Sequence, residues 1–278
     1  MLESDEIFMI RNKKKFKKSV YISLIIIFIV CLVFFSYKII LNIKDKNSIK
    51  NQEKDLNKII DIVEIENGEN INPPSDKEDM YWKFLKYSMI DVNIEDLKNV
   101  NKDVNGWIFV NNTNVNYPIV QSSDNDYYLN HQLDKKYNSA GWIFMDYRNN
   151  NIMNNNKNTI IYGHGLYNNA LFGSLKNTIK DKWFKNNKNL VIKSVDNSYS
   201  YLWQIFSIYT IPTTSDYIIT DFNNDDEYVN FLDLISNRSI YNFNVNLNKD
   251  DKIITLSTCY NSSTKLVVHA KLIKLANR

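Results

Sequence analysis

Cysteine and histidine are scarce in this chain. Its 278 residues include two cysteines and three histidines, and none of them stands in a C-x-x-C or H-x-x-x-H spacing. Zinc sites use closely spaced cysteine and histidine ligands, so the sequence argues against a zinc centre. Cys31 lies in an apolar segment that we interpret below as a membrane span. It cannot pair with Cys259 within one molecule, and Cys259 is therefore a lone thiol.

A strong net charge is also missing, as is any internal repeat. The formal charge is +3, and most of it comes from a basic cluster near the N-terminus. The rest of the chain is close to neutral, so nothing favours a nucleic-acid partner. The basic cluster comprises Arg11, Lys13, Lys14, Lys15, Lys17 and Lys18.

A long apolar run follows this basic cluster. Residues 19–37 are uncharged and rich in Ile, Leu, Val and Phe. As a helix they would span about 28 Å at about 1.5 Å per residue, close to the thickness of a bilayer core. By the positive-inside rule the basic flank stays cytoplasmic, which predicts a single-pass membrane protein with its C-terminal part outside the cell. A cleaved signal peptide is the alternative, but the run is long and lacks a small-residue cleavage site.

These features predict four segments. Residues 1–18 form a basic cytoplasmic tail, and residues 19–41 form the transmembrane anchor in contact with membrane lipid. Residues 42–76 form a polar extracellular stalk, partly helical, that ends at a Pro-Pro pair. Residues 77–278 form one domain, long enough to bury a core of its own.

Short β-type runs dominate the C-terminal domain. Apolar spacing predicts a helix over 77–98 and another over 170–180. A third helix, opened by acidic residues at Asp225, interrupts the strands within 212–250. This density of strands indicates a mainly β fold with a closed or nearly closed barrel. The predicted strands are 106–110, 115–120, 141–145, 159–162, 190–193, 199–210, 252–258 and 266–272.

Cys259 ends one of these apolar strands. A lone thiol at a strand end, with His164 between two glycines far upstream, is a candidate Cys-His nucleophile pair. The alternative is a buried structural cysteine, because cysteine packs as a small hydrophobe. His131 and His269 are weaker candidates for the histidine. His269 lies on the last strand, on the face opposite Val268.

Four stretches of the chain resemble a sortase, and most closely a class B sortase. Thr255–Cys259 reads TLSTC, which is similar to the family's TLxTC. Residues 158–164 read NTIIYGH, similar to the strand that presents the catalytic histidine. Residues 141–149 read GWIFMDYRN, and the helix-containing insertion at 212–250 is typical of class B. The resemblance covers residues 77–274.

This resemblance implies a fold and an activity. The fold is a closed sortase-type β-barrel of about eight strands, with N-terminal helices and a helix inserted before the penultimate strand. The activity is transpeptidation: Cys259 attacks the threonine carbonyl of a C-terminal sorting signal, of the N-P-x-T-x kind, in a secreted protein. An amine of a peptidoglycan precursor then resolves the acyl-enzyme. His164 would favour the thiolate and protonate the leaving amine, and no cofactor or metal is required.

The third catalytic position departs from the family pattern. Sortases carry an arginine before the apolar run of the last strand, where this chain has Lys265. Lysine keeps the charge but offers a point cation in place of a planar fork. Three explanations are open. Lys265 could replace the arginine less effectively, Arg238 of the insertion could reach the site in its place, or the enzyme could be impaired.

Four further residues are candidates for binding substrate. Ser257 and Thr258 flank the nucleophile, although strand hydroxyls are often only structural. Tyr167 follows His164 closely and could line the cleft or pack in the core. Tyr228 stands on the inserted helix, which we expect to form one wall of the groove.

Two rival functions use the same residues. A thiol hydrolase would resolve the acyl-enzyme with water instead of an amine. A catalytically degenerate module would bind sorting signals without cleaving them, and Lys265 is the sequence feature that supports this reading.

Overall fold

The computed structural model describes residues 2–166, 168–188, 190–261 and 263–278. Tyr167, one of the candidate substrate-binding residues, lies outside the described residues. The chain divides into two compact units, Met1–Ser48 and Ile49–Arg278.

The described residues of the first unit all belong to helix α1 (Leu2–Ile59), which continues into the second unit. Its apolar side chains from Val20 to Ile40 are exposed to solvent in the protein by itself. Among the described residues, the stretch Lys17–Leu56 is one helix long and apolar enough to cross a membrane.

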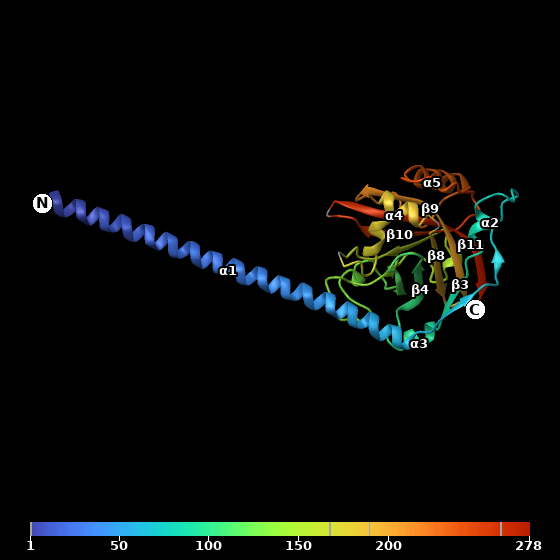
Figure 1. Ribbon diagram of the computed structural model, residues 1–278, viewed down its shortest axis with the longest axis horizontal. Helices are drawn as coiled ribbons and strands as arrows, with labels where there is room; N and C mark the ends of the chain where they lie inside the picture. The colour runs from blue at the N-terminus through green and yellow to red at the C-terminus, as the bar shows by residue number, and fades with distance from the viewer. Residues whose placement is uncertain (1, 167, 189, 262) are drawn as a thin grey trace. The chain divides into compact units, whose positions relative to one another are not determined.

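The second unit is built around a closed β-barrel of eight strands, which confirms the predicted fold class (Figure 1). The strands follow one another around the barrel in the order β10, β7, β6, β5, β4, β8, β9 and β11. An antiparallel β10–β11 pairing closes it. Their bounds are β4 Val104–Val110, β5 Asn116–Val120, β6 Phe144–Met145, β7 Asn158–Tyr162, β8 Val191–Asp196, β9 Tyr199–Pro212, β10 Ile253–Cys259 and β11 Thr264–Asn277.

The barrel interior holds the main hydrophobic core. Trp107, Trp142 and Trp203 are each fully buried, and they belong to one cluster with the inward-facing aliphatic residues of the strands. Because successive strand residues face opposite sides, each strand contributes alternate residues to this interior. The long strand β11 pairs with both β9 and β10, so it joins the two ends of the sheet.

The predicted helix over 77–98 is wrong. The chain instead forms α2 (Tyr81–Phe84), strand β3 (Met89–Val92) and α3 (Ile94–Lys98). β3 pairs with β1 (Ile62–Ile65), and the Asn93 side chain then caps α3. The apolar residues Tyr81, Phe84 and Met89 are buried, but a distant partner strand decided the conformation of Met89–Val92.

Residues expected to form the stalk take part in the second unit. β1 pairs with β3. β2 (Glu69–Asn70) pairs with β11 at Lys274 and Leu275, past the last residue of β11 that pairs with β10. Ile49 and Leu56, at the end of α1, are buried in the main core.

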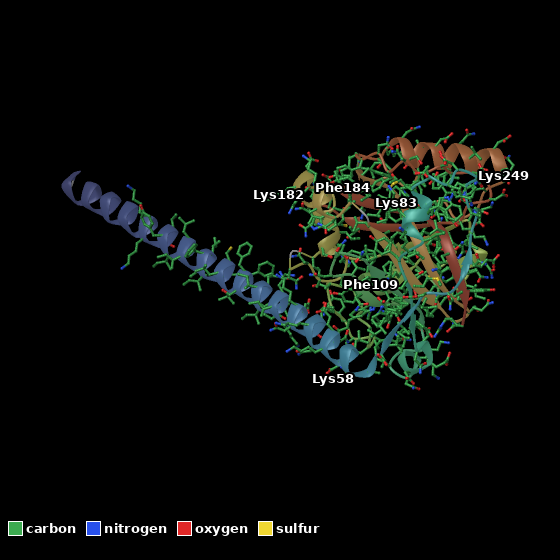
Figure 2. All side chains as sticks on the ribbon, turned by 45° about the vertical axis from the view of Figure 1, so that its right-hand side comes forward. Lys58, Lys83, Phe109, Lys182, Phe184 and Lys249 are labelled. Carbon is green, nitrogen blue, oxygen red and sulfur yellow. The ribbon has the colours of Figure 1, made fainter. Side chains whose placement is uncertain are left out.

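The helix predicted at Asp225 is confirmed as α5 (Asp225–Asn237). The Asn224 side chain caps it, and three acidic residues in its first turn complement the helix dipole. Its apolar face packs on the outer surface of the barrel, where Figure 1 shows it beside β9. Lys249, labelled in Figure 2, forms an ion pair with Asp225 at the start of α5.

The helix predicted over 170–180 is replaced by two shorter elements. A 3₁₀ turn, η3 (Gly173–Asn177), precedes α4 (Asp181–Asn186). A Cβ at Gly173 would lie 2.1 Å from the Leu166 carbonyl oxygen, so the chain doubles back too tightly here for a longer helix. Phe184 of α4, labelled in Figure 2, stacks on Tyr241 with ring centroids 3.6 Å apart.

Candidate active site

The last two strands place Cys259 and Lys265 opposite each other. The two residues are direct partners in the antiparallel β10–β11 register. Directly opposed side chains lie on the same face of a sheet, and the Lys265 Nζ donates to the Cys259 Sγ at 3.1 Å. An ammonium at this distance stabilises a thiolate over a neutral thiol.

His164 reaches the same place from the neighbouring strand. β7 runs parallel to β10, and His164 follows β7 by one glycine, as Cys259 ends β10. The His164 Nε2 is 2.9 Å from the Leu129 carbonyl oxygen. If this nitrogen carries the proton, the bond holds the ring and leaves Nδ1 for chemistry.

The glycine after His164 permits a close approach of the two strand ends. A Cβ at Gly165 would lie 2.5 Å from the Cys259 carbonyl oxygen and 2.9 Å from the Thr258 Oγ1. Any side chain at this position would therefore separate the histidine loop from the cysteine. This contact explains why the sequence has glycine next to the candidate histidine.

Cys259, His164 and Lys265 line one cavity of about 300 Å³. Ser257 and Thr258 also line it, as do Leu129 and Phe144 on the side of the barrel that carries β6. The structure therefore brings together five of the seven residues that the sequence singled out. Within the described residues, no group of three or more His, Cys, Asp or Glu side chains is arranged to hold a metal ion.

The electrostatics of this cavity disfavour a charged imidazole in the resting protein. Burial lowers the pKa of His164, the hydrogen bond to Leu129 opposes this shift, and the Lys265 charge lowers the pKa further. A neutral His164 beside a cation is able to accept a proton but must gain one before it acts as an acid.

The two arginines near the site are engaged elsewhere. Arg238 forms a bidentate ion pair with Asp216 (3.0 and 2.6 Å) and lies over the Tyr209 ring. Arg148 binds Asp146 with two of its nitrogens (2.9 and 2.7 Å). Lys265 is thus the cation in contact with the thiol, in agreement with the first of the three explanations for the missing arginine.

The flanking residues differ in their roles. The Ser257 Oγ shares a hydrogen bond of 2.9 Å with the Tyr217 hydroxyl. The Thr258 Oγ1 is buried and has no partner among the described residues.

Tyr228 is fully buried on the inner face of α5, and its hydroxyl donates to the carbonyls of Asp251 and Lys157. It does not line the cavity, which corrects its placement in the groove; its side chain belongs to the inner face of the helix.

Neither of the other histidines reaches the cavity lining. The His131 ring stacks on Tyr127 with centroids 4.1 Å apart. His269 is fully buried, and its two ring nitrogens meet the hydroxyls of Tyr209 and Thr255. Both are structural in this fold.

Two residues of the site were missed in the sequence. Tyr217 lines the cavity from the insertion, and nothing in its local sequence indicates this. The Lys176 Nζ donates to the Gly165 carbonyl at 2.6 Å, and the Cys259 charge acts on this ammonium. Lys176 is therefore a second cation close to the thiol, brought there by the 3₁₀ turn η3.

Comparison with known proteins agrees with this geometry. The chain matches the sortase domain over residues 108–273. It is 36% identical to sortase B of Staphylococcus aureus (strain NCTC 8325 / PS 47) over 257 residues, which cover 90% of this chain and 96% of that protein. It is 35% identical to sortase B of Listeria monocytogenes serovar 1/2a over 184 residues, 65% of this chain and 74% of that protein.

Solved structures show the same fold. A B. anthracis sortase B in complex with AAEK1 superposes with a TM-score of 0.59 and 40% identity, covering 65% of this chain and 84% of that one. A Staphylococcus aureus sortase B–substrate complex gives a TM-score of 0.60 and 39% identity over 65% and 84% of the chains.

The chain therefore belongs to the sortase family of cysteine transpeptidases. Within that family, its relatives and its structural neighbours place it in class B.

Proposed function

We propose that this protein cleaves a C-terminal sorting signal of the N-P-x-T-x kind after its threonine and joins the threonine to a cell-wall amine. The observation that carries the proposal is the contact of the Lys265 ammonium with the Cys259 sulfur, in a cavity shared with His164. These three groups are what thioester chemistry needs: a nucleophile, a proton carrier and a fixed cation.

The reaction proceeds in two balanced steps. His164 first takes the proton of the Cys259 thiol. The resulting thiolate attacks the threonine carbonyl, a C–S bond forms, and the C–N bond breaks as His164 passes that proton to the leaving amine. The incoming amine then attacks the thioester, His164 takes up its proton, the C–S bond breaks, and the proton returns to the Cys259 sulfur. Lys265 faces the oxygen on which negative charge develops, in the position where relatives carry arginine.

Substrate contacts follow from the cavity lining. The unpartnered Thr258 Oγ1 is available to the substrate backbone, and Ser257 acts through Tyr217. Tyr167 remains a proposed cleft residue. One structural neighbour is a sortase B–substrate complex, which supports substrate binding by this chain too.

The proposed cellular setting follows from helix α1. Residues 19–41 anchor the protein in the membrane, with residues 1–18 in the cytoplasm and the catalytic unit outside. Secreted proteins that bear sorting signals and peptidoglycan-precursor amines both meet at that membrane face.

The test is cleavage of a quenched fluorescent library of sorting peptides by the full chain in detergent micelles, with a tripeptide amine as acceptor. We expect cleavage by the wild type, none by Cys259→Ala, and faster cleavage by Lys265→Arg because a planar fork replaces a point charge. Mass spectrometry of the product distinguishes an amide from a free acid.

Each other outcome has a definite meaning. Free acid in the presence of abundant amine would identify a hydrolase. Peptide binding without cleavage, in the wild type and in Lys265→Arg alike, would contradict the proposal and favour the binding module.

A further inference from the structure

The loop that follows His164 is tied back to its own start. A β-bridge joins Gly165 to Leu171, and the Phe172 N–H donates to the His164 carbonyl at 3.1 Å. Asn169 and Leu171 have φ values of 62° and 51°. Side chains are strained in this left-handed region, so the loop needs external contacts to keep its form.

Tyr117 of β5 supplies one such contact from outside the loop. Its hydroxyl accepts a hydrogen bond from the Leu171 N–H at 3.0 Å and donates one to the Glu53 Oε1 at 2.5 Å. The ring is buried and packs edge-on against Trp142. Burial, and then Glu53, raise the pKa of Tyr117, so the hydroxyl keeps its proton and donates at neutral pH.

Glu53 comes from the end of helix α1. Ile49 and Leu56, on either side of it, are 0% and 4% exposed in the main core. The helix end is therefore fixed by the burial of Ile49 and Leu56. This packing, together with the hydrogen bond, keeps Glu53 at the Tyr117 hydroxyl.

We propose that Glu53 and Tyr117 are positioning residues that hold the His164 loop from the end of helix α1. The inference rests on the proposed catalytic role of His164. Helix α1 then has two functions. Its N-terminal part is the proposed membrane anchor, and Glu53 near its C-terminal end orients the catalytic loop. A shift of the helix end then changes the rate of the reaction and not only the stability of the fold.

Tyr201 offers a matched control. It is another buried tyrosine whose hydroxyl donates to a carboxylate, Asp196, and accepts from a backbone N–H, that of Asn154 at 3.2 Å. None of these residues lines the active-site cavity. Tyr201→Phe and Tyr117→Phe therefore remove the same pair of hydrogen bonds at two different places.

The experiment measures two quantities on the full chain in detergent micelles. One is the kcat and KM of peptide cleavage, and the other is the pKa of His164 from NMR of ¹³C-labelled histidine, which is practical with three histidines. We expect Tyr117→Phe to lower kcat about fivefold or more, with KM changed less than about twofold, because misplacing a catalytic group acts on the chemical step. We also expect the His164 pKa to rise toward its ordinary value as the loosened ring becomes hydrated.

Glu53→Leu should shift both quantities in the same direction by a smaller amount, since Leu171 keeps its acceptor. Tyr201→Phe should leave both unchanged, although its melting temperature falls.

Equal effects of Tyr117→Phe and Tyr201→Phe on kcat and on the His164 pKa would overturn the inference. If the wild type cleaves no peptide, the proposed function fails, but the titration of His164 still decides whether Tyr117 positions this loop. Should Tyr117→Phe not fold, Glu53→Leu alone decides it.

Discussion

Lys265 shows at the scale of one residue how a departure from a family pattern is accommodated. It stands directly across from Cys259 in the β10–β11 pair, and its ammonium contacts the sulfur. A lysine has the reach for this contact and keeps the charge, but it lacks the several fixed donors of arginine. Arg238 is not free to substitute for it, because Asp216 holds its guanidinium with two hydrogen bonds.

Lys176 provides a second cation near the same sulfur. Burial lowers its pKa, whereas the Cys259 charge opposes this shift. We expect Lys176→Met to slow the alkylation of Cys259 by iodoacetamide at pH 7 about fivefold, the effect of a charge interaction of about 1 kcal/mol. The measurement is made in a Cys31→Ser background, so that Cys259 is the remaining thiol.

Two control variants belong to this measurement. Lys176→Arg keeps the charge and should react at nearly the wild-type rate. Lys180→Met removes an exposed lysine that donates to Asn177 at 2.9 Å, and it should have no effect. An unchanged rate in Lys176→Met would show that this ammonium does not stabilise the Cys259 thiolate.

At the scale of the element, strand β11 contributes one residue to the active-site cavity and another to the buried interior. Its first residues place Lys265 at the cavity, and four residues further on His269 is fully buried, with Tyr209 of β9 and Thr255 of β10 as hydrogen-bond partners. Burial, and to a smaller extent the Arg238 charge, lower the pKa of His269 to about 3.

This burial predicts a specific dependence of stability on pH. In the unfolded chain His269 gains a proton near its ordinary pKa of about 6.5, whereas in the folded chain it stays neutral down to about pH 3. The unfolded state binds more protons in this window, so stability is full above pH 6.5 and falls by about 1.4 kcal/mol per pH unit below it.

Urea unfolding between pH 7.5 and 5 measures this effect. His269→Gln should be less stable at pH 7.5 but lose less stability on acidification than the wild type. Parallel curves for the two proteins would contradict a buried neutral His269. His164 adds a similar dependence in the same direction, because its pKa is also lowered, and it is present in both proteins.

At the scale of the whole molecule, the catalytic unit begins before the Pro-Pro pair. β1 and β2 pair with β3 and β11, and Ile49 and Leu56 are buried in the main core. We expect residues 49–278 to fold and cleave peptide at nearly the rate of the full chain. Residues 77–278, the boundary that the sequence predicted, should melt at least about 5 °C lower, since they lose buried apolar side chains worth about 2 kcal/mol each.

Differential scanning calorimetry of the two truncated chains tests this boundary. If both melt at the same temperature, the first 28 residues of the longer chain contribute nothing to the fold. The predicted extent of the domain would then be correct.

The sequence by itself determined the chemistry of this protein and the class of its fold. A strand that ends in TLSTC, and a second that is followed by a glycine-flanked histidine, predict the nucleophile and its partner, because both features are local to a strand end. The capped, acidic start of α5 was equally local and was predicted correctly. Lys265 followed from the resemblance, as the residue at the position where sortases carry an arginine before the apolar run of the last strand.

Only the tertiary structure decided which distant groups serve the site. Tyr217 of the insertion lines the cavity, and Lys176 of a 3₁₀ turn contacts the Gly165 carbonyl beside it. The local sequences of the two residues carry no periodicity that indicates these positions. Met89–Val92 became a strand, not a helix, because β1 supplied a partner for its backbone. The hold of Glu53 on the histidine loop joins residues more than a hundred positions apart. Such contacts arise when the barrel closes, and a pattern confined to neighbours in sequence cannot contain them.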